Sequence, residues 1–212
     1  MVAIGIPWTK PHPDVVGYAH RDHSNRVSHW RMADVMSKHG FPGSVSLSVA
    51  LCQHHPEVVA DANARGWEFF SHGIYNTRFL YGMDETQERT FYQDNIDSLK
   101  RHIGMDLKGI LTPAITNTER TPALIAESGM LYHADWVHDD VPVPILVPGH
   151  KLISMPYSYD LNDAPLWDGR PYGGQYFVQA CKDAFDRLYL ESDESAKVFC
   201  IALHPYQIGQ PH

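Results

Sequence analysis

The sequence contains few cysteines: Cys52, Cys181 and Cys200 are the only three among 212 residues, and none of them forms a CxxC pair. A sparse, odd-numbered set of this kind excludes a disulfide framework and a zinc knuckle, and it indicates reduced thiols. Long apolar runs are absent, and no basic segment followed by an apolar one opens the chain. We therefore expect no membrane span, no secretion signal and a cytoplasmic location.

Positive charge is also scarce, because 17 Lys and Arg residues face 25 Asp and Glu residues, for a formal net charge of −8 at pH 7. The Lys and Arg residues form no cluster, so neither nucleic acid nor an anionic membrane is an expected partner. Histidine, in contrast, is plentiful at 14 residues. Imidazole is both a common metal ligand and a proton shuttle near neutral pH, so position along the chain must identify the histidines that take part in chemistry.

Apolar strand-like runs alternate with amphipathic helical runs along the chain. The patterns predict strands at 44–50, 67–71, 108–112, 130–134, 152–155 and 198–203, and helices at 27–40, 56–66, 84–104, 121–129 and 175–190. This alternation predicts an α/β fold with a parallel sheet, in one domain over residues 1–212. Six strands suit an incomplete β/α barrel, in which functional side chains gather at the carboxyl ends of the strands.

The strongest local pattern is Glu68-Phe-Phe-Ser-His72. Residues 68 and 72 of a strand point to the same face, so we expect Glu68 and His72 to look into the barrel together. A buried carboxylate beside a histidine is costly unless the two share a proton, bind a metal or serve catalysis. A purely structural Glu–His pair is the alternative interpretation.

Further polar and aromatic side chains follow the other predicted strands. His204 comes directly after the apolar run 198–203, which places it well for a general acid or base, unless it only ends a strand in a His–Pro turn. Trp136 can form a pocket wall, and Asp135 can orient a histidine or bind a substrate amide; a loop with solvated carboxylates is the alternative. The remaining candidates on this rim are Pro113 and Tyr157.

In this order the motifs resemble those of the polysaccharide deacetylases, the NodB-homology group similar to carbohydrate esterase family 4. Members of this family remove acetyl groups from chitin, peptidoglycan or related sugars. His72-Gly-x-x-Asn76 is similar to the family motif in which two histidines bind a divalent metal, and Glu68 occupies the position of a family carboxylate. The three later motifs are matched by Thr112–Pro113, Asp135–Trp136 and Leu203-His204-Pro205, the last of which supplies a catalytic histidine in the family.

A tighter resemblance links the sequence to the branch of PuuE-type allantoinases and cyclic imide hydrolases. It rests on the segments Arg21-Asp-His-Ser-Asn-Arg-Val27, Pro156-Tyr-Ser-x-x-x-Asn162-Asp163 and Ile208-Gly-Gln-Pro211. The resemblance implies a distorted seven-stranded barrel. Asn76 replaces the second metal histidine, and asparagine is a poorer zinc ligand than imidazole. The first strand of the family, with its acidic motif, and the final helix have no counterpart, so we expect an N-terminally incomplete domain.

The resemblance implies a hydrolase that acts on non-peptide C–N bonds, with a small cyclic amide, ureide or imide as the expected substrate. In a metal-dependent version, His72 helps to hold one zinc-type divalent ion that activates water. In a metal-independent version, Glu68 or Asp22 is the base and His204 protonates the leaving nitrogen. The residues expected to contact the substrate are Trp136, Tyr157, Asp135, Pro113 and Asn76.

Two other functions compete with this prediction. The first is a metal-dependent carbohydrate N-deacetylase that acts on an acetylated sugar in carbohydrate metabolism. The second is a catalytically silent homologue retained for binding or as a scaffold. In each case we expect a homo-oligomer, a dimer or tetramer, because a barrel without one strand and one helix exposes apolar edges that a neighbour can cover.

Overall fold

The computed structural model describes residues 13–165 and 173–211. The chain divides into two compact units, one formed by residues 42–157 and the other by residues 1–41 together with 158–212. Each unit has its own internal packing. The prediction of one domain over residues 1–212 stays a prediction.

The unit of residues 42–157 is built on a six-stranded sheet with the order β1-β2-β3-β4-β6-β5. Its strands are β1 Ser44–Leu47, β2 Glu68–Ser71, β3 Gly109–Ile110, β4 Tyr132–His133, β5 Val143–Val147 and β6 His150–Ser154. Neighbouring strands are parallel except for β5, which pairs antiparallel with β6 at one edge. An open, mostly parallel sheet confirms the predicted α/β class and the incomplete barrel.

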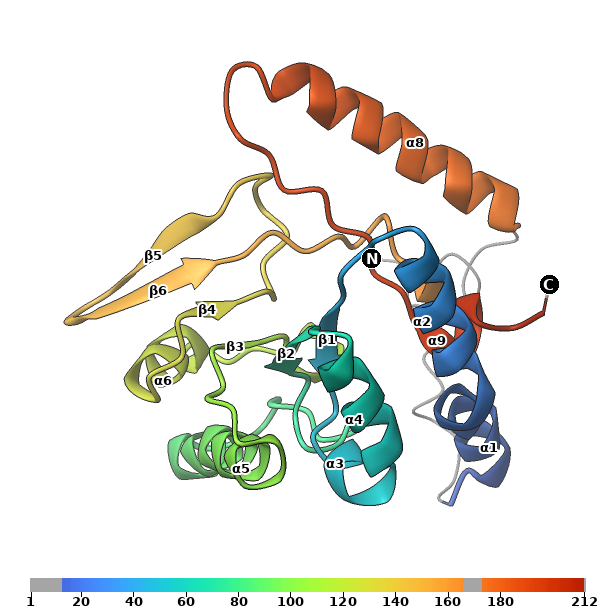
Figure 1. Ribbon diagram of the computed structural model, residues 1–212. Coiled ribbons are helices and arrows are strands. Elements are labelled where there is room, and N and C mark those ends of the chain that lie inside the picture. The colour runs from blue at the N-terminus through green and yellow to red at the C-terminus, as the bar shows by residue number, and fades with distance from the viewer. Residues whose placement is uncertain (1–12, 166–172, 212) are drawn as a thin grey trace. The chain divides into compact units, whose positions relative to one another are not determined.

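Helices cover one side of this sheet (Figure 1). They are α3 Leu51–His54, α4 Pro56–Ala64, α5 Glu85–Ile103 and α6 Thr121–Glu127, and the short 3₁₀ turn η3 spans Pro113–Ile115. Contacts join α3 to α4 and α5, and α5 to α6, so these helices form one layer. In β2, Phe69 and Ser71 are buried, and the Ser71 hydroxyl donates to Asn95 of α5 at 2.7 Å. This face of the strand therefore points at the helices.

The helix predicted from Asp84 to Gly104 is confirmed. Asp84 caps α5 by accepting the backbone N–H of Gln87 at 2.9 Å, and the Gln87 side chain accepts the backbone N–H of Asp84 at 2.9 Å. This capping box satisfies two N–H groups that lack partners within the helix. Gly104 ends the helix with φ +76°, in the left-handed region that favours glycine.

Two parts of the predicted sheet differ from the structure. The hairpin arm β5 was not predicted, and the strand predicted at Val198–Leu203 is wrong. Within that segment, Ala202 alone forms a bridge, pairing parallel with Asn162. Ile201 is 39% exposed, so the apolar run is not enclosed between two layers as a buried strand would be.

The second unit contains α1 Val15–His23, the π-helical turn η2 Ser24–Ser28, α2 His29–Lys38, α8 Gly174–Glu191 and α9 Pro205–Ile208. The first three form one helical stretch, and α9 contacts all of them. Gly209 permits this packing, because a Cβ there would lie 2.4 Å from Cβ of Ser28. Among the described residues, no helix combines the length and the apolar character needed to cross a membrane.

Candidate active site

The site residues predicted from the sequence fall into both units. Asp22 and His204 lie in the unit formed by the two chain ends. The unit of residues 42–157 contains the other seven: Glu68, His72, Asn76, Pro113, Asp135, Trp136 and Tyr157. The candidate side chains therefore form two groups, one in each unit.

His204 is held by a buried carboxylate, that of Asp163. The ring Nδ1 of His204 lies 2.7 Å from Oδ1 of Asp163, and the backbone N–H of His204 donates to Oδ2 at 2.8 Å. The Asp163 side chain is fully buried, whereas 35% of the His204 side chain is exposed. A carboxylate beside Nδ1 keeps a proton on that nitrogen, so Nε2 is the nitrogen that exchanges protons.

Two extended segments bring these residues together. Ala202 donates its backbone N–H to the carbonyl of Leu161 at 2.9 Å, and Asp163 donates its own to the carbonyl of Ala202 at 3.2 Å. These bonds align residue 163 with the segment that ends at His204. Asp163 was not among the predicted site residues, although it closes the Pro156–Asp163 motif. Its position in that motif was the signal that could have identified it.

Aromatic and basic groups surround Tyr206, which follows His204. The ring centroids of Tyr206 and His204 are 5.5 Å apart, and those of Tyr206 and His20 are 5.6 Å apart. The guanidinium of Arg21 lies 5.5 Å from the Tyr206 centroid, a cation–π distance. Asp22 is half-buried in the last turn of α1, and its Oδ1 accepts a hydrogen bond from Asn25 Nδ2 at 3.3 Å. The catalytic role of Asp22 stays a prediction.

The two segments at opposite ends of the sequence that carried the tighter resemblance pack together. His23 Nδ1 lies 2.7 Å from Ser28 Oγ and 3.2 Å from Gln210 Nε2. Arg31 donates to the carbonyl of Gly209 at 3.3 Å. Segments 21–27 and 208–211 therefore form one structural element around the π-helical turn, a type of turn that is frequent at functional sites.

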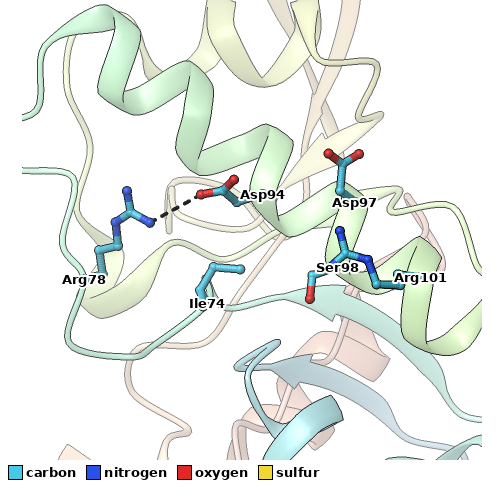
Figure 2. Close-up of a pocket in the computed structure, with 6 residues that line it drawn as sticks. All are labelled: Ile74, Arg78, Asp94, Asp97, Ser98 and Arg101. Atoms are coloured by element: carbon cyan, nitrogen blue, oxygen red, sulfur yellow. Dashed lines mark ion pairs between the residues drawn. The ribbon is translucent and has the colours of Figure 1, made fainter.

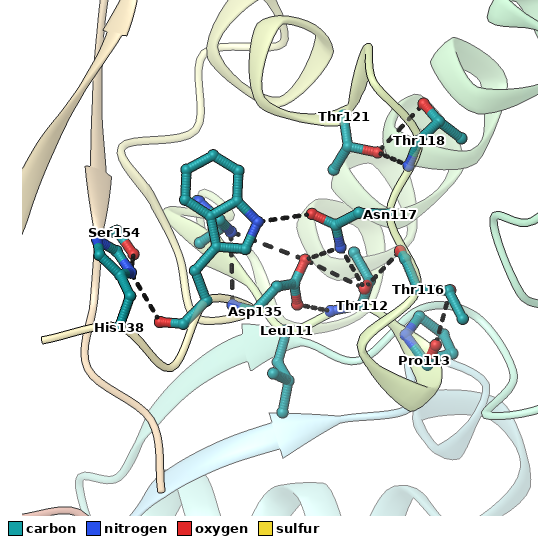
Figure 3. Close-up of polar contacts among 12 residues, drawn as sticks. Leu111, Thr112, Pro113, Thr116, Asn117, Thr118, Thr121, Asp135, His138 and Ser154 are labelled. Atoms are coloured by element: carbon teal, nitrogen blue, oxygen red, sulfur yellow. Dashed lines mark hydrogen bonds and ion pairs between the residues drawn. The ribbon is translucent and has the colours of Figure 1, made fainter. Parts of the chain in front are cut away.

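In the other unit, Asp135 joins the end of β4 to the loop that follows β3 (Figure 3). Its Oδ1 accepts the backbone N–H of Thr112 at 2.7 Å, and its Oδ2 accepts from Asn117 Nδ2 at 2.8 Å. The Thr112 hydroxyl lies 3.1 Å from Oδ2 and 2.8 Å from the Thr116 carbonyl, and its single proton serves one of these acceptors at a time. Asp135 is only 4% exposed. Its carboxylate therefore faces protein donors.

Trp136 is exposed to 38%, yet its indole is held from two sides. Its Nε1 donates to Asn117 Oδ1 at 3.2 Å. Its ring stands perpendicular, at 88° and 4.8 Å between centroids, to the fully buried ring of His133. Nε2 of His133 is the one buried side-chain nitrogen or oxygen atom without a hydrogen-bond partner in the described part of the chain.

His72 lies at the carboxyl end of β2, where a tight turn brings the chain against Pro113. The Nδ1 of His72 donates to the carbonyl of Leu111 at 2.8 Å, which leaves the lone pair on Nε2. Gly73 has φ +76°, and a Cβ there would lie 2.7 Å from Cγ of Pro113. Directly after Pro113, Ala114 and Ile115 adopt φ of 53° and 55°, strained values of a kind that clusters at functional sites.

Comparison with known proteins supports the fold. No family model matches the sequence, and no curated protein does. Among solved structures, PuuE allantoinase is 30% identical with a TM-score of 0.86, over 93% of this chain and 66% of that one. A probable polysaccharide deacetylase from Pseudomonas aeruginosa PAO1 is also 30% identical, with a TM-score of 0.82, over 91% of this chain and 65% of that one. The chain belongs to the polysaccharide deacetylase superfamily.

The fold of this superfamily also appears in a polysaccharide deacetylase-like protein from Mycobacterium smegmatis, which is 23% identical with a TM-score of 0.81. The match covers 91% of this chain and 68% of that one. The chain thus spans just under two thirds of the length of PuuE allantoinase and of the Pseudomonas protein.

Deacetylases of this superfamily are typically metal-dependent, and a metal site requires several donor side chains close together. Among the described residues, no three His, Cys, Asp or Glu side chains are grouped so as to hold an ion. His72 provides one imidazole, and Asn76, an exposed residue, provides only an amide. Zinc takes three or four protein ligands. The described residues therefore do not provide the ligands of such a site.

The position of Glu68 differs from the one that the sequence predicted. Glu68 opens β2 and is exposed, so the expectation that it is buried beside His72 is wrong. His72 follows the opposite end of the strand, about 13 Å away at the usual rise per residue. Tyr132 donates its phenol O–H to Glu68 Oε1 at 3.3 Å. Burial, and then the Glu68 carboxylate, raise the pKa of Tyr132. The catalytic role of Glu68 stays a prediction.

A surface hollow of about 280 Å³ lies between the loop after β2 and helix α5 (Figure 2). Arg78 and Asp94 form an ion pair across it at 3.6 Å, and both side chains are more than 40% exposed. Its lining residues are Ile74, Arg78, Asp94, Asp97, Ser98 and Arg101. No predicted site residue is among them, so the hollow is separate from the candidate site.

Proposed function

We propose that this protein hydrolyses a non-peptide C–N bond in a small cyclic amide, ureide or imide. The observation that carries the proposal is the pair formed by His204 and the buried Asp163 carboxylate. Membership of the polysaccharide deacetylase superfamily supports amide hydrolysis as the reaction type. The likeness to PuuE allantoinase supports a small cyclic substrate rather than a polymer.

Amide hydrolysis requires an activated water, stabilisation of an oxyanion and a proton for the leaving nitrogen. In our proposal His204 supplies the proton. Asp163 keeps Nδ1 protonated, so the imidazolium form of His204 carries its transferable proton on Nε2. The proton passes to the nitrogen as the C–N bond breaks, and the Asp163 carboxylate holds the ring in position for this step.

We propose the metal-independent version of the reaction, with Asp22 as the base that activates water. Asp22 belongs to the same compact unit as His204. His72 is the predicted metal ligand of the other version. Asn76 stands at the position where the superfamily has a second histidine, so His72 lacks its partner ligand. Glu68, the other predicted base, is less well supported because it is exposed at the far end of β2.

For substrate binding we propose Trp136, whose fixed and partly exposed indole offers a flat surface to a planar ring. Tyr157 is half-buried, is the last residue of the sheet unit, and keeps its predicted role as a second aromatic contact. Pro113 is buried against the turn at Gly73, and its predicted contact with the substrate is retained as a proposal. Asn76 is exposed, and its predicted contact with the substrate is retained as a proposal.

The proposal is tested with a substrate panel of allantoin, hydantoin, succinimide and an N-acetylglucosamine oligomer. Ring opening and acetate release are followed by proton nuclear magnetic resonance, with and without a chelator. We expect ring opening of at least one cyclic compound, at a rate that the chelator leaves unchanged, and no release of acetate. Turnover of none of the cyclic compounds would contradict the proposal.

A metal-dependent sugar N-deacetylase is the second candidate, favoured by the 30% identity to the Pseudomonas protein. It predicts acetate release that Zn²⁺ or Co²⁺ stimulates and a chelator abolishes. A catalytically silent homologue, the third candidate, predicts a folded protein without turnover of any compound in the panel.

We also propose that the protein is a homo-oligomer, a dimer or tetramer. Several large apolar side chains of α8 are exposed, namely Tyr176, Val178, Phe185, Tyr189 and Leu190. A second copy that covers them would remove apolar surface from water. A monomer at every concentration in light scattering would contradict this. The cytoplasmic location and the absence of nucleic-acid and membrane partners stay predictions.

A further inference from the structure

We infer that Asn117, which carries no role in the reaction described above, is the positioning residue that fixes Trp136 for substrate binding. The inference rests on the proposed function to the extent that Trp136 contacts the substrate ring. It concerns the specificity of the site: a planar ring is selected because the indole that stacks on it is held in one orientation.

Both ends of the Asn117 amide are in use. The Nδ2 group donates to Asp135 Oδ2 at 2.8 Å, and Oδ1 accepts the indole N–H of Trp136 at 3.2 Å. The carboxylate only accepts and the indole only donates. One orientation of the amide therefore satisfies both neighbours. Since Asp135 and Trp136 are consecutive residues, Asn117 connects two adjacent side chains at the end of β4.

Asp135 acts through this connection and not by direct contact with substrate. It is 4% exposed, and its oxygens accept the backbone N–H of Thr112 and the amide of Asn117. A carboxylate so enclosed has no open side for a ligand. Its function is to hold the loop after β3, and with it Asn117, in register with β4. The substrate-binding role predicted for Asp135 becomes an indirect one.

Trp136 has the properties of a rigid platform. Its N–H is bound, and the perpendicular ring of the buried His133 fixes its position from one side. Even so, 38% of its surface is exposed. A side chain that is already ordered loses little conformational entropy when a ligand packs on it, and this raises affinity. Loss of the Asn117 contact would free the indole, and ligand binding would then have to order it.

A second anchor holds the same loop and supplies a matched control. Thr118 donates its hydroxyl to Oε2 of Glu88 at 2.7 Å, and Glu88 is fully buried. Replacement of Thr118 by valine removes this anchor. It leaves both hydrogen bonds of Asn117 in place, because Thr118 takes part in neither of them. The variants Thr118→Val and Asn117→Ala thus loosen one loop in different ways.

The first test is a double-mutant cycle on ligand binding. Succinimide and hydantoin are titrated by calorimetry into a His204→Ala background, in which turnover is expected to be slow. We expect Asn117→Ala to weaken binding by about 2- to 12-fold, the range for one hydrogen bond. In a Trp136→Phe background, where no indole N–H exists, the same change should have almost no effect. Equal losses in both backgrounds would overturn the inference.

The second test needs neither activity nor a ligand. The fluorescence of Trp136 is obtained by subtraction of the Trp136→Phe spectrum. Its quenching by acrylamide reports how mobile the indole is and how accessible it is to the quencher. Quenching should increase in Asn117→Ala and stay at the wild-type level in Thr118→Val. An unchanged value in Asn117→Ala would overturn the inference. If no ligand binds the wild-type protein, the proposed function fails, while the quenching result still decides the role of Asn117.

Discussion

The carboxylate of Asp163 holds His204 twice, through its ring Nδ1 at 2.7 Å and through its backbone N–H at 2.8 Å. One buried group therefore fixes both the position of the residue and the tautomer of its imidazole. The two partners are 41 positions apart in the sequence, so the pair is a long-range contact of its unit. A neutral side chain of similar size at position 163 would separate the effect on the position of His204 from the effect on its tautomer.

Asp163→Asn is expected to lower kcat strongly, by about 10²-fold or more, with a small effect on KM. The asparagine amide can donate to Nδ1, which moves the ring proton to Nε2 and leaves the imidazole in the unproductive tautomer. Steady-state kinetics on the cyclic substrate that is turned over fastest measures this change. An unchanged kcat would show that the orientation of His204 by Asp163 has no role in the reaction.

Glu88 offers a test of how the loop after β3 is held. Its fully buried carboxylate accepts hydroxyl groups from Tyr92, Thr118 and Thr121. Glu88→Gln replaces one accepting oxygen by a donor that faces hydroxyl groups, so we expect a loss of about 1–3 kcal/mol in the free energy of unfolding, measured in urea.

The control for Glu88 lies on the same helix. Glu85 pairs with Arg89 at the surface, where its side chain is 55% exposed. Glu85→Gln should cost less than about 1 kcal/mol. Similar losses for the two variants would mean that the network around Glu88 has no special weight.

Two tyrosines should make the fold sensitive to alkaline pH. Burial, followed by a neighbouring carboxylate, raises the pKa of Tyr92 beside Glu88 and of Tyr132 beside Glu68. The native state keeps these protons above pH 10, where the unfolded state loses them. The free energy of unfolding should therefore be unaffected by these groups below about pH 10 and fall as pH rises beyond it.

Urea unfolding at a series of pH values measures this dependence, and phenolate absorbance follows the titration itself. Tyr132→Phe should make the decline above pH 10 less steep, because it removes one of the two protons that differ between the states. The same slope in Tyr132→Phe and in the wild-type protein would contradict the raised pKa of Tyr132.

The turn that places His72 should depend on Gly73. An alanine there would meet two penalties, a φ of +76° and a Cβ 2.7 Å from Pro113 Cγ. Gly82 has a φ of +78° but nothing within 4 Å of a Cβ, so Gly82→Ala meets the first penalty alone. We expect a loss of about 1 kcal/mol for Gly82→Ala and a distinctly larger one for Gly73→Ala, by urea unfolding. Equal losses would show that the approach to Pro113 carries no constraint.

The sequence was most informative where the physics is local. Asp84 and Gln87 predicted the start of α5, and Gly104 its end, because a capping box and a left-handed terminal residue involve only near neighbours. The run 198–203 misled, since apolar character alone does not say whether a second layer covers a segment. Ile201 is in fact 39% exposed.

The site was predictable only in part for a related reason. His204, Asp135 and Trp136 follow runs of apolar residues, and this pattern drew attention to each of them. Their partners follow no such run: Asp163 lies 41 positions from His204, and Asn117 lies 18 and 19 positions from Asp135 and Trp136. Strand alternation correctly put Glu68 on the face opposite to the buried Phe69, but it did not reveal that this face is open at Glu68.

The central claim is that His204 supplies the proton for cleavage of a C–N bond, and chemical rescue tests it most directly. Ring opening of the best cyclic substrate is measured for the wild-type protein and for His204→Ala, with and without imidazole in the assay. We predict a loss of roughly 10²- to 10⁴-fold in kcat for His204→Ala, part of which imidazole restores. Full activity of His204→Ala without imidazole would contradict the claim.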